Sequence, residues 1–481
     1  MVVALAGGVL LTSCSTGTAS RKGGSPTTSI TPALSTTTTT VSHGTPQWLS
    51  YGHDLSNTRT NTAETAITPA SVSRLQRRWS KSISAGVAGT PVVSDGIVYF
   101  GSLTGTAYAL SLSNGSVVWS TYLGAAEIVG SPAVTQNAAL FGLGNTLYRL
   151  DRRNGKIQWR ATTNPSAFSQ INASPVVVGN LVLIGTAQFE EVVGKPPATF
   201  RGSIGAFNLN TGKRVWNFIT TADNKRSGAG EGVWSTPCVD PAAGLLFVGT
   251  GQNISKPTGP LADSLLAIDY RTGKLKWYKQ FTYPDVFGVG NFSGKDADVG
   301  ASPNLWTVGS TTVVGVGQKN GTYHALNAAN GKEIWNTRIT PGSSFGGVLG
   351  SAALADGRII ASSNIGNPHT NSVTSASKIV ALDPATGKVL WSDTEVGDIF
   401  GPVSAVPGVA FVGTVTNPLG KVSVGKYLAL STSTGKTLWT FTPPAHVGGG
   451  ASIVDGNLVW GYGFPLFSGA GAGGVIDFTL S

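Results

Sequence analysis

The sequence predicts an all-β fold, an eight-bladed β-propeller built from four-stranded antiparallel blades. Three observations carry this prediction. A hairpin motif ending in Trp recurs along the chain, an apolar strand pair precedes most copies, and the two ends of the repeat region complement each other. Each repeat is about four strands long, which is the size of one propeller blade.

The hairpin is clearest between Val380 and Trp391, which read V-A-L-D-P-A-T-G-K-V-L-W. Its first residues alternate in the manner of a half-buried strand. Asp383 to Gly387 form a turn, because Pro384 fixes φ and Gly387 can take positive φ. The returning strand ends in the large apolar ring of Trp391. The other copies end at Trp119, Trp159, Trp216, Trp277, Trp335 and Trp439.

The eighth blade is predicted from the two ends of the repeat region. The chain ends in G-G-V-I-D-F-T-L, an inner strand with no Trp strand after it, whereas residues 75–82 form a Trp strand with no hairpin before it. We expect residues 75–82, with Trp79, to complete the blade formed by residues 450–480, since closing the ring removes exposed sheet edges. A ring of blade interfaces also explains how 481 residues fold without one very large core.

The N-terminus predicts export. Residues 1–14 end in L-T-S-C and resemble a bacterial lipoprotein signal peptide, so we expect cleavage before Cys14 and acylation of its thiol. The segment lacks the Lys or Arg of a signal peptide, which indicates a start codon further upstream, and a buried N-terminal strand is the alternative. Residues 15–45 are rich in Ser and Thr and are interpreted as a disordered tether. The propeller then spans residues 46–481, held by its lipid at the outer face of the cell membrane or envelope.

Composition excludes several other classes of protein. Only Cys14 and Cys238 are present, so we expect no disulfide in the propeller and a packed thiol at Cys238. No C-x-x-C-H motif occurs, so no covalent c-type haem is expected.

The net charge of +10 comes from scattered basic residues, which favours a solvated surface or attraction to anionic wall polymers over nucleic-acid binding. We expect a monomer with no nucleic-acid partner. Motifs of Ser-His-Asp hydrolases, P-loop proteins and H-E-x-x-H zinc enzymes are missing from the sequence.

The hairpin pattern A-x-D-x-x-T-G-K-x-x-W resembles the repeat of pyrroloquinoline quinone (PQQ) dependent dehydrogenases and their propeller relatives. The resemblance covers roughly residues 46–481. The opening W-L-S-Y-G-H-D-L-S-N-T-R, residues 48–59, is similar to the start of the family's first blade. Residues 296–321 and 448–463 are most similar to the polyvinyl alcohol dehydrogenase branch. The repeat alone is shared with non-catalytic scaffold propellers.

The resemblance implies a PQQ site. PQQ is a flat tricyclic ortho-quinone with three carboxylates, so its site needs a flat floor and hydrogen-bond donors around the rim. Trp234, in G-V-W-S-T-P, matches a Trp that lies under the quinone ring in the family, although it could instead be a Trp that only packs between blades. Asn172, Lys319 and Asn364 match further residues around the cofactor.

The resemblance also implies a calcium ion at one edge of PQQ. Calcium prefers hard oxygen ligands. The family's Glu ligand falls on Glu190, with Glu191 beside it, and its Asn ligand falls on Gln252, with Asn253 next. For the Glu pair, a solvated loop edge is the alternative.

The general base of the family falls on Asp296, with Asp298 as the alternate, in the pattern D-A-D-V-G-A-S-P. Two carboxylates this close can raise one pKa toward a useful range, although the same spacing fits an ordinary acidic turn. Lys319, in G-Q-K-N-G, matches a cation near the quinone oxygens.

Two functions remain open from the sequence. The first is an exported PQQ- and calcium-dependent alcohol dehydrogenase, which oxidises a polymeric or secondary alcohol by hydride transfer and needs a separate electron acceptor. The second is a lipid-anchored propeller that has lost cofactor chemistry and acts as a binding scaffold. Four features together favour the enzyme: Trp234, the Glu190–Glu191 pair, Asp296 and Lys319. Ala88 and Val129 favour the scaffold, because the family often carries an acidic residue and an Arg at these places.

Overall fold

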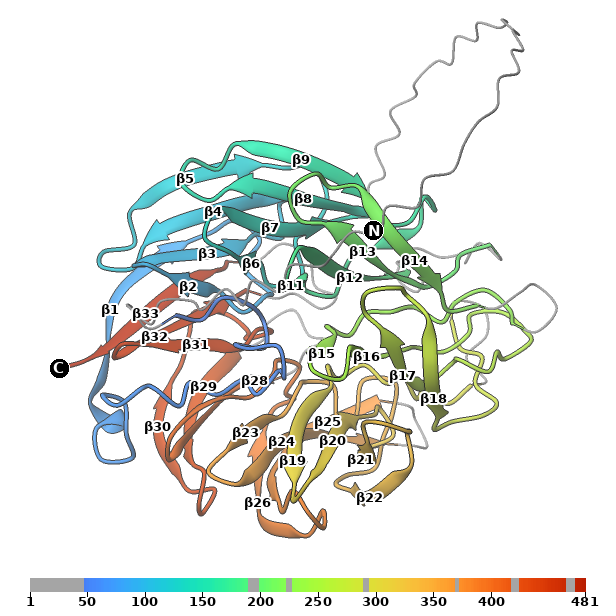
Figure 1. Cartoon of the computed structure of the whole chain (residues 1–481). Coiled ribbons are helices and arrows are strands. Elements are labelled where there is room, and N and C mark those ends of the chain that lie inside the picture. The colour runs from blue at the N-terminus through green and yellow to red at the C-terminus, as the bar shows by residue number, and fades with distance from the viewer. Residues whose placement is uncertain are drawn as a thin grey trace, which may run out of the picture. The chain divides into compact units, whose positions relative to one another are not determined.

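The computed structural model describes residues 47–188, 199–221, 227–288, 294–367, 372–416, 424–463 and 472–481. These residues form eight separate antiparallel sheets arranged around a common centre, as Figure 1 shows. One short 3₁₀ helix, η1 (Val72–Arg74), precedes the first strand. No helix among the described residues is long and apolar enough to cross a membrane. The predicted eight-bladed propeller is confirmed.

The strands of each blade follow one another from the centre outward. Blade 1 contains β2 (Val92–Ser94), β3 (Ile97–Gly101), β4 (Thr106–Ser111) and β5 (Val117–Tyr122). Blade 2 contains β6 (Ala133–Val134), β7 (Ala138–Leu143), β8 (Thr146–Asp151) and β9 (Ile157–Thr162). Blade 3 contains β11 (Val176–Val178), β12 (Leu181–Gln188), β13 (Ser203–Asn208) and β14 (Arg214–Ile219), with β10 (Ser169–Gln170) also paired to β12. Blade 4 contains β15 (Cys238–Asp240), β16 (Leu245–Gly249), β17 (Ser264–Asp269) and β18 (Leu275–Gln280).

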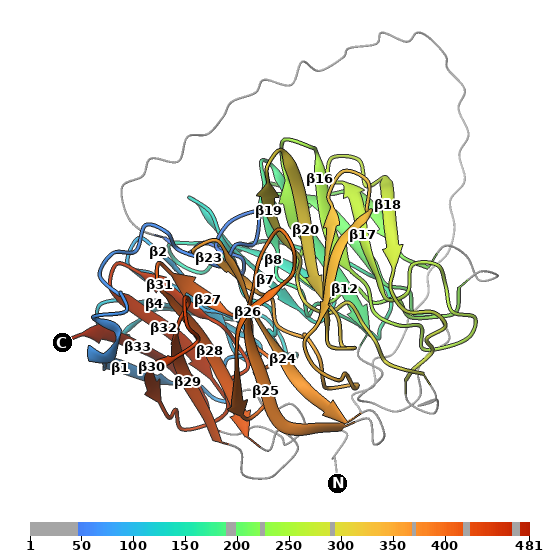
Figure 2. The same ribbon diagram turned by 90° about the horizontal axis from the view of Figure 1, so that it is seen from below.

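The second half of the ring repeats this order, and its strands β24 and β25 form the long orange hairpin in Figure 2. Blade 5 contains β19 (Asn304–Val308), β20 (Thr311–Gly317), β21 (Thr322–Asn327) and β22 (Glu333–Arg338). Blade 6 contains β23 (Ala353–Ala355), β24 (Arg358–Asn367), β25 (Ser372–Leu382) and β26 (Val389–Val396). Blade 7 contains β27 (Ser404–Val406), β28 (Val409–Thr416), β29 (Val424–Ser431) and β30 (Thr437–Phe441). Blade 8 contains β31 (Ala451–Val454), β32 (Asn457–Tyr462), β33 (Gly474–Leu480) and β1 (Leu75–Ser82).

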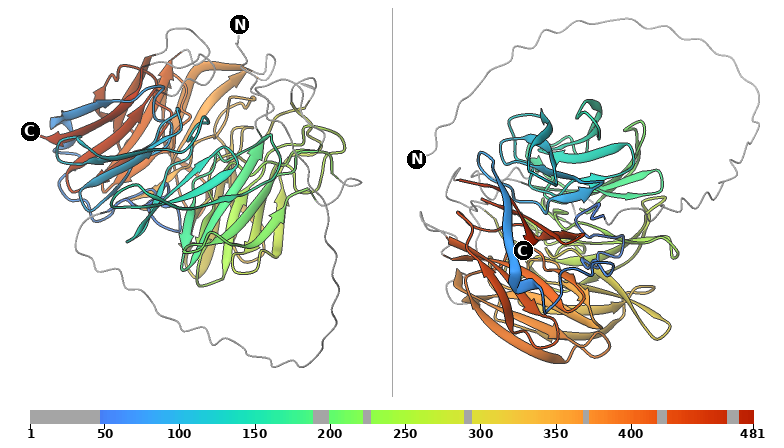
Figure 3. Two further views of the ribbon diagram at one scale, coloured as in Figure 1. Left: turned by 90° about the horizontal axis from the view of Figure 1, so that it is seen from above. Right: turned by 90° about the vertical axis from the view of Figure 1, so that its left-hand side faces the viewer.

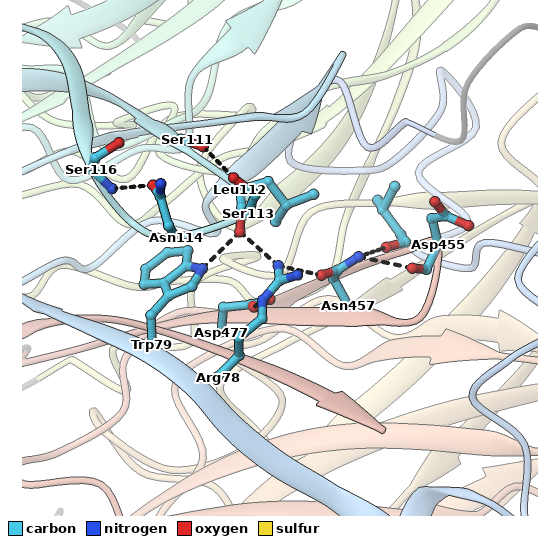
Figure 4. Close-up of polar contacts among 11 residues, drawn as sticks. Arg78, Trp79, Ser111, Leu112, Ser113, Asn114, Ser116, Asp455, Asn457 and Asp477 are labelled. Carbon is cyan, nitrogen blue, oxygen red and sulfur yellow. Dashed lines mark hydrogen bonds and ion pairs between the residues drawn. The ribbon is translucent and has the colours of Figure 1, made fainter. Parts of the chain in front are cut away.

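Blade 8 closes the ring as the sequence predicts. Strand β1 pairs antiparallel with the C-terminal strand β33, and Trp79 lies opposite Asp477. Figure 3 shows β1 in blue beside the red C-terminal strands. Arg78 also stabilises this closure. Its guanidinium donates to Asp477, to Asn457 of β32 and to the Leu112 carbonyl of blade 1, as drawn in Figure 4.

The Trp residues join each blade to the next. Each indole N–H donates to a backbone carbonyl of the following blade at 2.7–3.2 Å. At seven of these eight interfaces, all but that of Trp439, the turn glycine of the following blade lies against the same ring: a Cβ on Gly155, whose φ is 72°, would lie 2.6 Å from the Trp119 ring. The glycine is therefore required both by its backbone conformation and by the Trp contact. The donors are Trp79, Trp119, Trp159, Trp216, Trp277, Trp335, Trp391 and Trp439.

Residues 47–61 do more than begin the first blade. Their backbone and side chains bind the innermost strands of seven blades, and blade 3 is the exception among the described contacts. This segment therefore spans one end of the central channel and links the blades there. The contacts, at 2.7–2.9 Å, join Trp48 to Val93, Leu49 to Val134, Leu55 to Val239, Ser56 to Leu305, Thr58 to Leu354, Arg59 to Ala405 and Asn61 to Ile453.

The core of the protein lies between the blades, as expected for a propeller. The two middle strands of the sheets are largely buried, whereas most outer strands alternate between partly buried and exposed residues. Cys238, at the start of β15, is fully buried and packs among apolar residues of blades 4 and 5, which confirms the packed thiol.

Candidate functional site

A cavity of about 470 Å³ lies at the centre of the ring, where the chain enters the first strand of each blade. Its wall includes residues from all eight of these entering segments. Small residues predominate close to the strands, so side chains from a few positions set the chemistry of the cavity. Trp234, Asn172 and Lys319, three of the predicted site residues, line it.

Trp234 differs from the Trp residues that join the blades. It is half-buried, lines the cavity, and its indole N–H donates no hydrogen bond to the described residues. Two glycines leave room for the ring: a Cβ on Gly300 would overlap it, and a Cβ on Gly251 would lie 3.3 Å from its Nε1. A flat aromatic side chain exposed to a cavity is the geometry expected of a floor for a planar ligand.

Lys319 lies at the end of β20 and is only 8% exposed. Its Nζ donates to Asp296 Oδ1 at 2.9 Å, pairs with Asp298 Oδ2 at 2.7 Å, and lies 5.6 Å from the centre of the Trp234 ring. Asp298 also accepts the backbone N–H of Gln252 at 2.8 Å, so both of its oxygens are bonded. The structure therefore brings the three predicted catalytic residues together beside the predicted floor.

Two further aspartates lie behind this group, and the sequence did not single them out. Asp263 is fully buried, and neither of its carboxylate oxygens has a hydrogen-bond partner among the described residues. Burial, together with the charges of Asp298, Asp285 and Asp296, raises the pKa of Asp263 well above its usual range. Burial and the neighbouring charges thus favour the neutral form of the Asp263 carboxyl. No local motif marks it, because the four carboxylates meet only in the folded protein.

Asp285 is also buried, but its carboxylate is well bonded. It accepts backbone N–H groups from Lys295 at 2.8 Å, Asp296 at 3.2 Å and Ala297 at 2.8 Å. Burial raises the pKa of Asp285, and the charge of Asp298 adds to this effect, whereas the three N–H donors oppose it. Asp285 thus holds the backbone of the segment that carries Asp296.

The amides predicted as metal ligands are engaged in the protein. Asn253 donates to Ser227, Gly228 and Ala229, and its Oδ1 accepts the Gly259 N–H at 2.7 Å. Gln252 donates from Nε2 to the Phe287 carbonyl at 3.2 Å. These bonds organise the loop after β16.

The remaining metal candidates lie outside the described part of the chain. Glu190, Glu191 and the lipidation residue Cys14 are all there. Within the described ranges, no group of three or more His, Cys, Asp or Glu side chains is arranged to hold a metal ion.

Asn364 does not line the cavity. It is fully buried, accepts the Ile399 N–H at 2.6 Å and donates to the Phe345 carbonyl at 3.3 Å. Its role is to fix the segments that enter blades 6 and 7, since Phe345 and the neighbouring Phe400 both line the cavity. Ala88 and Val129, by contrast, do lie in the cavity wall.

Comparison with known proteins agrees with this geometry. The PQQ-repeat family profile, described as outer membrane protein assembly factor BamB, matches residues 65–286, 227–366, 261–440 and 375–469. The chain belongs to this PQQ-repeat family. Within it, the chain lies near the polyvinyl alcohol dehydrogenase branch, as the sequence predicts.

Two relatives are named polyvinylalcohol dehydrogenase. The one from Pseudomonas sp. is 28% identical over 77% of this chain, and the one from Sphingopyxis sp. (strain 113P3) is 27% identical over 76%. The chain spans 64% of the length of each. The crystal structure of quinohemoprotein alcohol dehydrogenase from Comamonas testosteroni superimposes with a TM-score of 0.73, 20% identity, and coverage of 90% of this chain and 80% of that one, which shows the shared fold.

Proposed function

We propose that the protein is a PQQ-dependent alcohol dehydrogenase that oxidises a secondary or polymeric alcohol. The observation that carries this proposal is the ion-paired group of Lys319, Asp296 and Asp298 beside the exposed face of Trp234. Lys319 lines the cavity, and the two carboxylates are buried directly behind its ammonium group. A cavity-lining cation paired with buried carboxylates is a typical arrangement for acid–base chemistry. The names of the polyvinyl alcohol dehydrogenase relatives support the same reaction class.

The residues of the cavity fit PQQ. Trp234 offers a flat surface at the cavity, and Gly300 and Gly251, which lie against the indole, make room for it there. Asn172 and Ser131 line the cavity, and the Ser131 hydroxyl has no hydrogen-bond partner among the described residues. These groups and Lys319 are suitable donors for the carboxylates and carbonyls of a quinone cofactor.

Bound PQQ would supply a quinone that accepts a hydride from the carbinol carbon. The protein's own contribution is made by three side chains. Lys319 favours the ionised form of Asp296, the form that can accept the proton of the substrate hydroxyl. The same ammonium group stabilises negative charge that develops near the Trp234 face. Asp298, bonded through both oxygens, holds Lys319 in place.

Calcium, export and lipid anchoring belong to the proposal on sequence grounds. The described residues do not form a calcium site by themselves, so no step is assigned to the metal. The ligands expected from the sequence are Glu190 or Glu191, together with the amide oxygen of Gln252 or Asn253. The lipid anchor is proposed at Cys14 and would hold the protein at the outer face of the membrane. The reaction would also need a separate electron acceptor. The alternative that Ala88 and Val129 suggested from the sequence, a scaffold propeller without a cofactor, is not favoured by the relatives named polyvinylalcohol dehydrogenase.

Reconstitution separates the two functions. The protein would be purified without cofactor, titrated with PQQ in the presence and absence of Ca²⁺, and assayed by dye reduction with primary alcohols, secondary alcohols and polyvinyl alcohol. We expect saturable binding, followed by turnover that depends on added alcohol, and loss of PQQ binding in Trp234→Ala. Absence of saturable binding at micromolar PQQ would establish the scaffold instead.

A further inference from the structure

Asp285 connects two segments of the proposed active site that lie ten to twelve residues apart in sequence. Asp285 lies in the loop after β18. Its carboxylate accepts the backbone N–H groups of three consecutive residues, Lys295, Asp296 and Ala297. Asp296, the proposed base, has a φ of 49°, in the left-handed region that non-glycine residues rarely adopt. The carboxylate of Asp285 therefore holds the backbone of the proposed base in an unusual conformation.

Asp285 is itself fixed from the other side. The residue after it, Val286, forms a β-bridge with Asn253, and the next N–H, that of Phe287, donates to the Asn253 carbonyl at 2.9 Å. Thr258 donates to the carbonyl of Asp285 at 3.2 Å. Asn253 is held in turn by the four side-chain bonds described above. A continuous set of hydrogen bonds thus runs from the loop after β16 to the backbone of Asp296.

The hydrogen bonds continue from Asp296 to the cavity through Lys319. Asp296 Oδ1 accepts from Lys319 Nζ, and Lys319 lies over the Trp234 ring. The position of the Asp296 carboxylate relative to Trp234 consequently depends on the backbone at residues 295–297, which Asp285 sets. Gly294 gives the carboxylate its space, because a Cβ at that position would overlap Asp285 Oδ1.

We infer that Asp285 is a positioning residue for the proposed reaction: it does not touch substrate, but it orients Asp296 through the three N–H groups at residues 295–297. This inference rests on the proposed function for its catalytic consequence, and on the hydrogen bonds alone for its structural one. A misplacement of about 1 Å in a reacting group can cost about 10²-fold in rate, so a positioning residue should affect kcat strongly.

The first test needs no cofactor. Hydrogen–deuterium exchange of peptides covering residues 294–300 would be measured in the apoprotein for wild type, Asp285→Asn, Asp285→Ala and Gly294→Ala. Loss of a charged acceptor should speed exchange of the three amides by about tenfold or more in Asp285→Ala. Asp285→Asn, which keeps one acceptor oxygen, should show a smaller change, and Gly294→Ala should resemble Asp285→Ala.

A matched control comes from the same blade. Asp269 also accepts two backbone N–H groups, from Arg271 and Thr272, but in an outer hairpin turn. Asp269→Ala should leave exchange at residues 294–300 unchanged. Unchanged exchange in Asp285→Ala would overturn the structural part of the inference, whatever the protein's function.

The second test uses protein loaded with PQQ. We expect Asp285→Ala to lower kcat by about 10- to 100-fold, with KM and PQQ affinity within about threefold of wild type, and Asp285→Asn to recover part of kcat. Faster exchange at residues 295–297 with wild-type kcat would overturn the positioning role while leaving the dehydrogenase intact. A wild-type protein that never turns over would instead refute the proposed function.

Discussion

Arg59 and Lys319 are two buried cations beside the same cavity, and their surroundings differ. The guanidinium of Arg59 donates to the Val403 carbonyl at 2.6 Å, to the Ser404 hydroxyl at 2.7 Å and to the Tyr51 carbonyl, and it forms no ion pair with the described residues. Burial lowers the pKa of Arg59 to about 10. Lys319, by contrast, pairs with two carboxylates and faces the Trp234 ring.

The difference indicates two roles: Arg59 stabilises the fold, whereas Lys319 takes part in the proposed reaction. Arg59 lies in the segment that spans the end of the channel. Its N–H groups fix that segment to blade 7 and, through the Thr90 hydroxyl at 3.4 Å, to blade 1, in each case through neutral oxygens. Lys319 is a point charge whose neighbours can change protonation. We therefore expect substitutions at Arg59 to change stability and substitutions around Lys319 to change reactivity.

The largest effect is expected on kcat, from substitution of the carboxylates that pair with Lys319. Asp296→Asn keeps the shape of the side chain but removes its ability to accept a proton, so kcat should fall by roughly 10²–10⁴-fold. PQQ affinity should stay within about threefold of wild type, measured by titration of the apoprotein. If Asp296→Asn and Asp298→Asn each retained full kcat, the base would lie elsewhere.

The next largest effect is expected on the free energy of unfolding, from substitution of Arg59. Arg59→Met leaves buried carbonyl and hydroxyl oxygens without their donor, and each such loss costs about 1–3 kcal/mol. We expect about 3 kcal/mol or more in the free energy of unfolding, measured in urea. Arg271→Met, which changes an exposed Arg, should cost about 0.5 kcal/mol or less. Equal losses from the two variants would show that Arg59 does not hold the segment.

Arg78 is an intermediate case, because it pairs with one buried carboxylate at the ring closure (Figure 4). Burial raises the pKa of Asp477 to about 7, and the charge of Arg78 opposes the rise. The folded protein thus binds this proton more tightly than the unfolded chain, so the stability it contributes is present below pH 4 and is lost as pH rises through 7.

Removing Arg78 should make the free energy of unfolding fall more steeply as the pH rises. Arg78→Met leaves ionised Asp477 without its cation, so we expect about 2 kcal/mol of destabilisation at pH 8 and clearly less at pH 5, measured by urea unfolding at both values. A loss that is the same at both pH values would mean that Asp477 does not titrate in this range.

The sequence predicted the ring well and the site in part. The eight Trp strands and the pairing of residues 75–82 with the C-terminal strand follow from local patterns, because a hairpin motif determines its own turn and its own Trp. The role of residues 47–61 could not be predicted, since its hydrogen bonds reach residues up to several hundred positions away. The pattern D-A-D placed Asp296 and Asp298 correctly beside Lys319.

Other site residues were beyond the sequence. Asp263 and Asp285 lie in loops with no motif, and only tertiary packing brings them to Asp296. Counting from Trp234 reached Gln252 and Asn253, but a count along the chain cannot show that the Asn253 amide is bonded to backbone and hydroxyl groups. Asn364 was predicted at the cofactor, whereas its buried amide joins the segments entering blades 6 and 7.

The most direct test of this contrast is the dissociation constant for PQQ of Lys319→Met, measured by titration of the apoprotein beside wild type and Arg59→Met. We expect Lys319→Met to weaken binding by at least about tenfold, because a charged hydrogen bond to the cofactor is lost. We expect folded Arg59→Met to bind like wild type. Wild-type affinity in Lys319→Met, or an equal loss in both variants, would contradict the assignment of Lys319 to the proposed reaction.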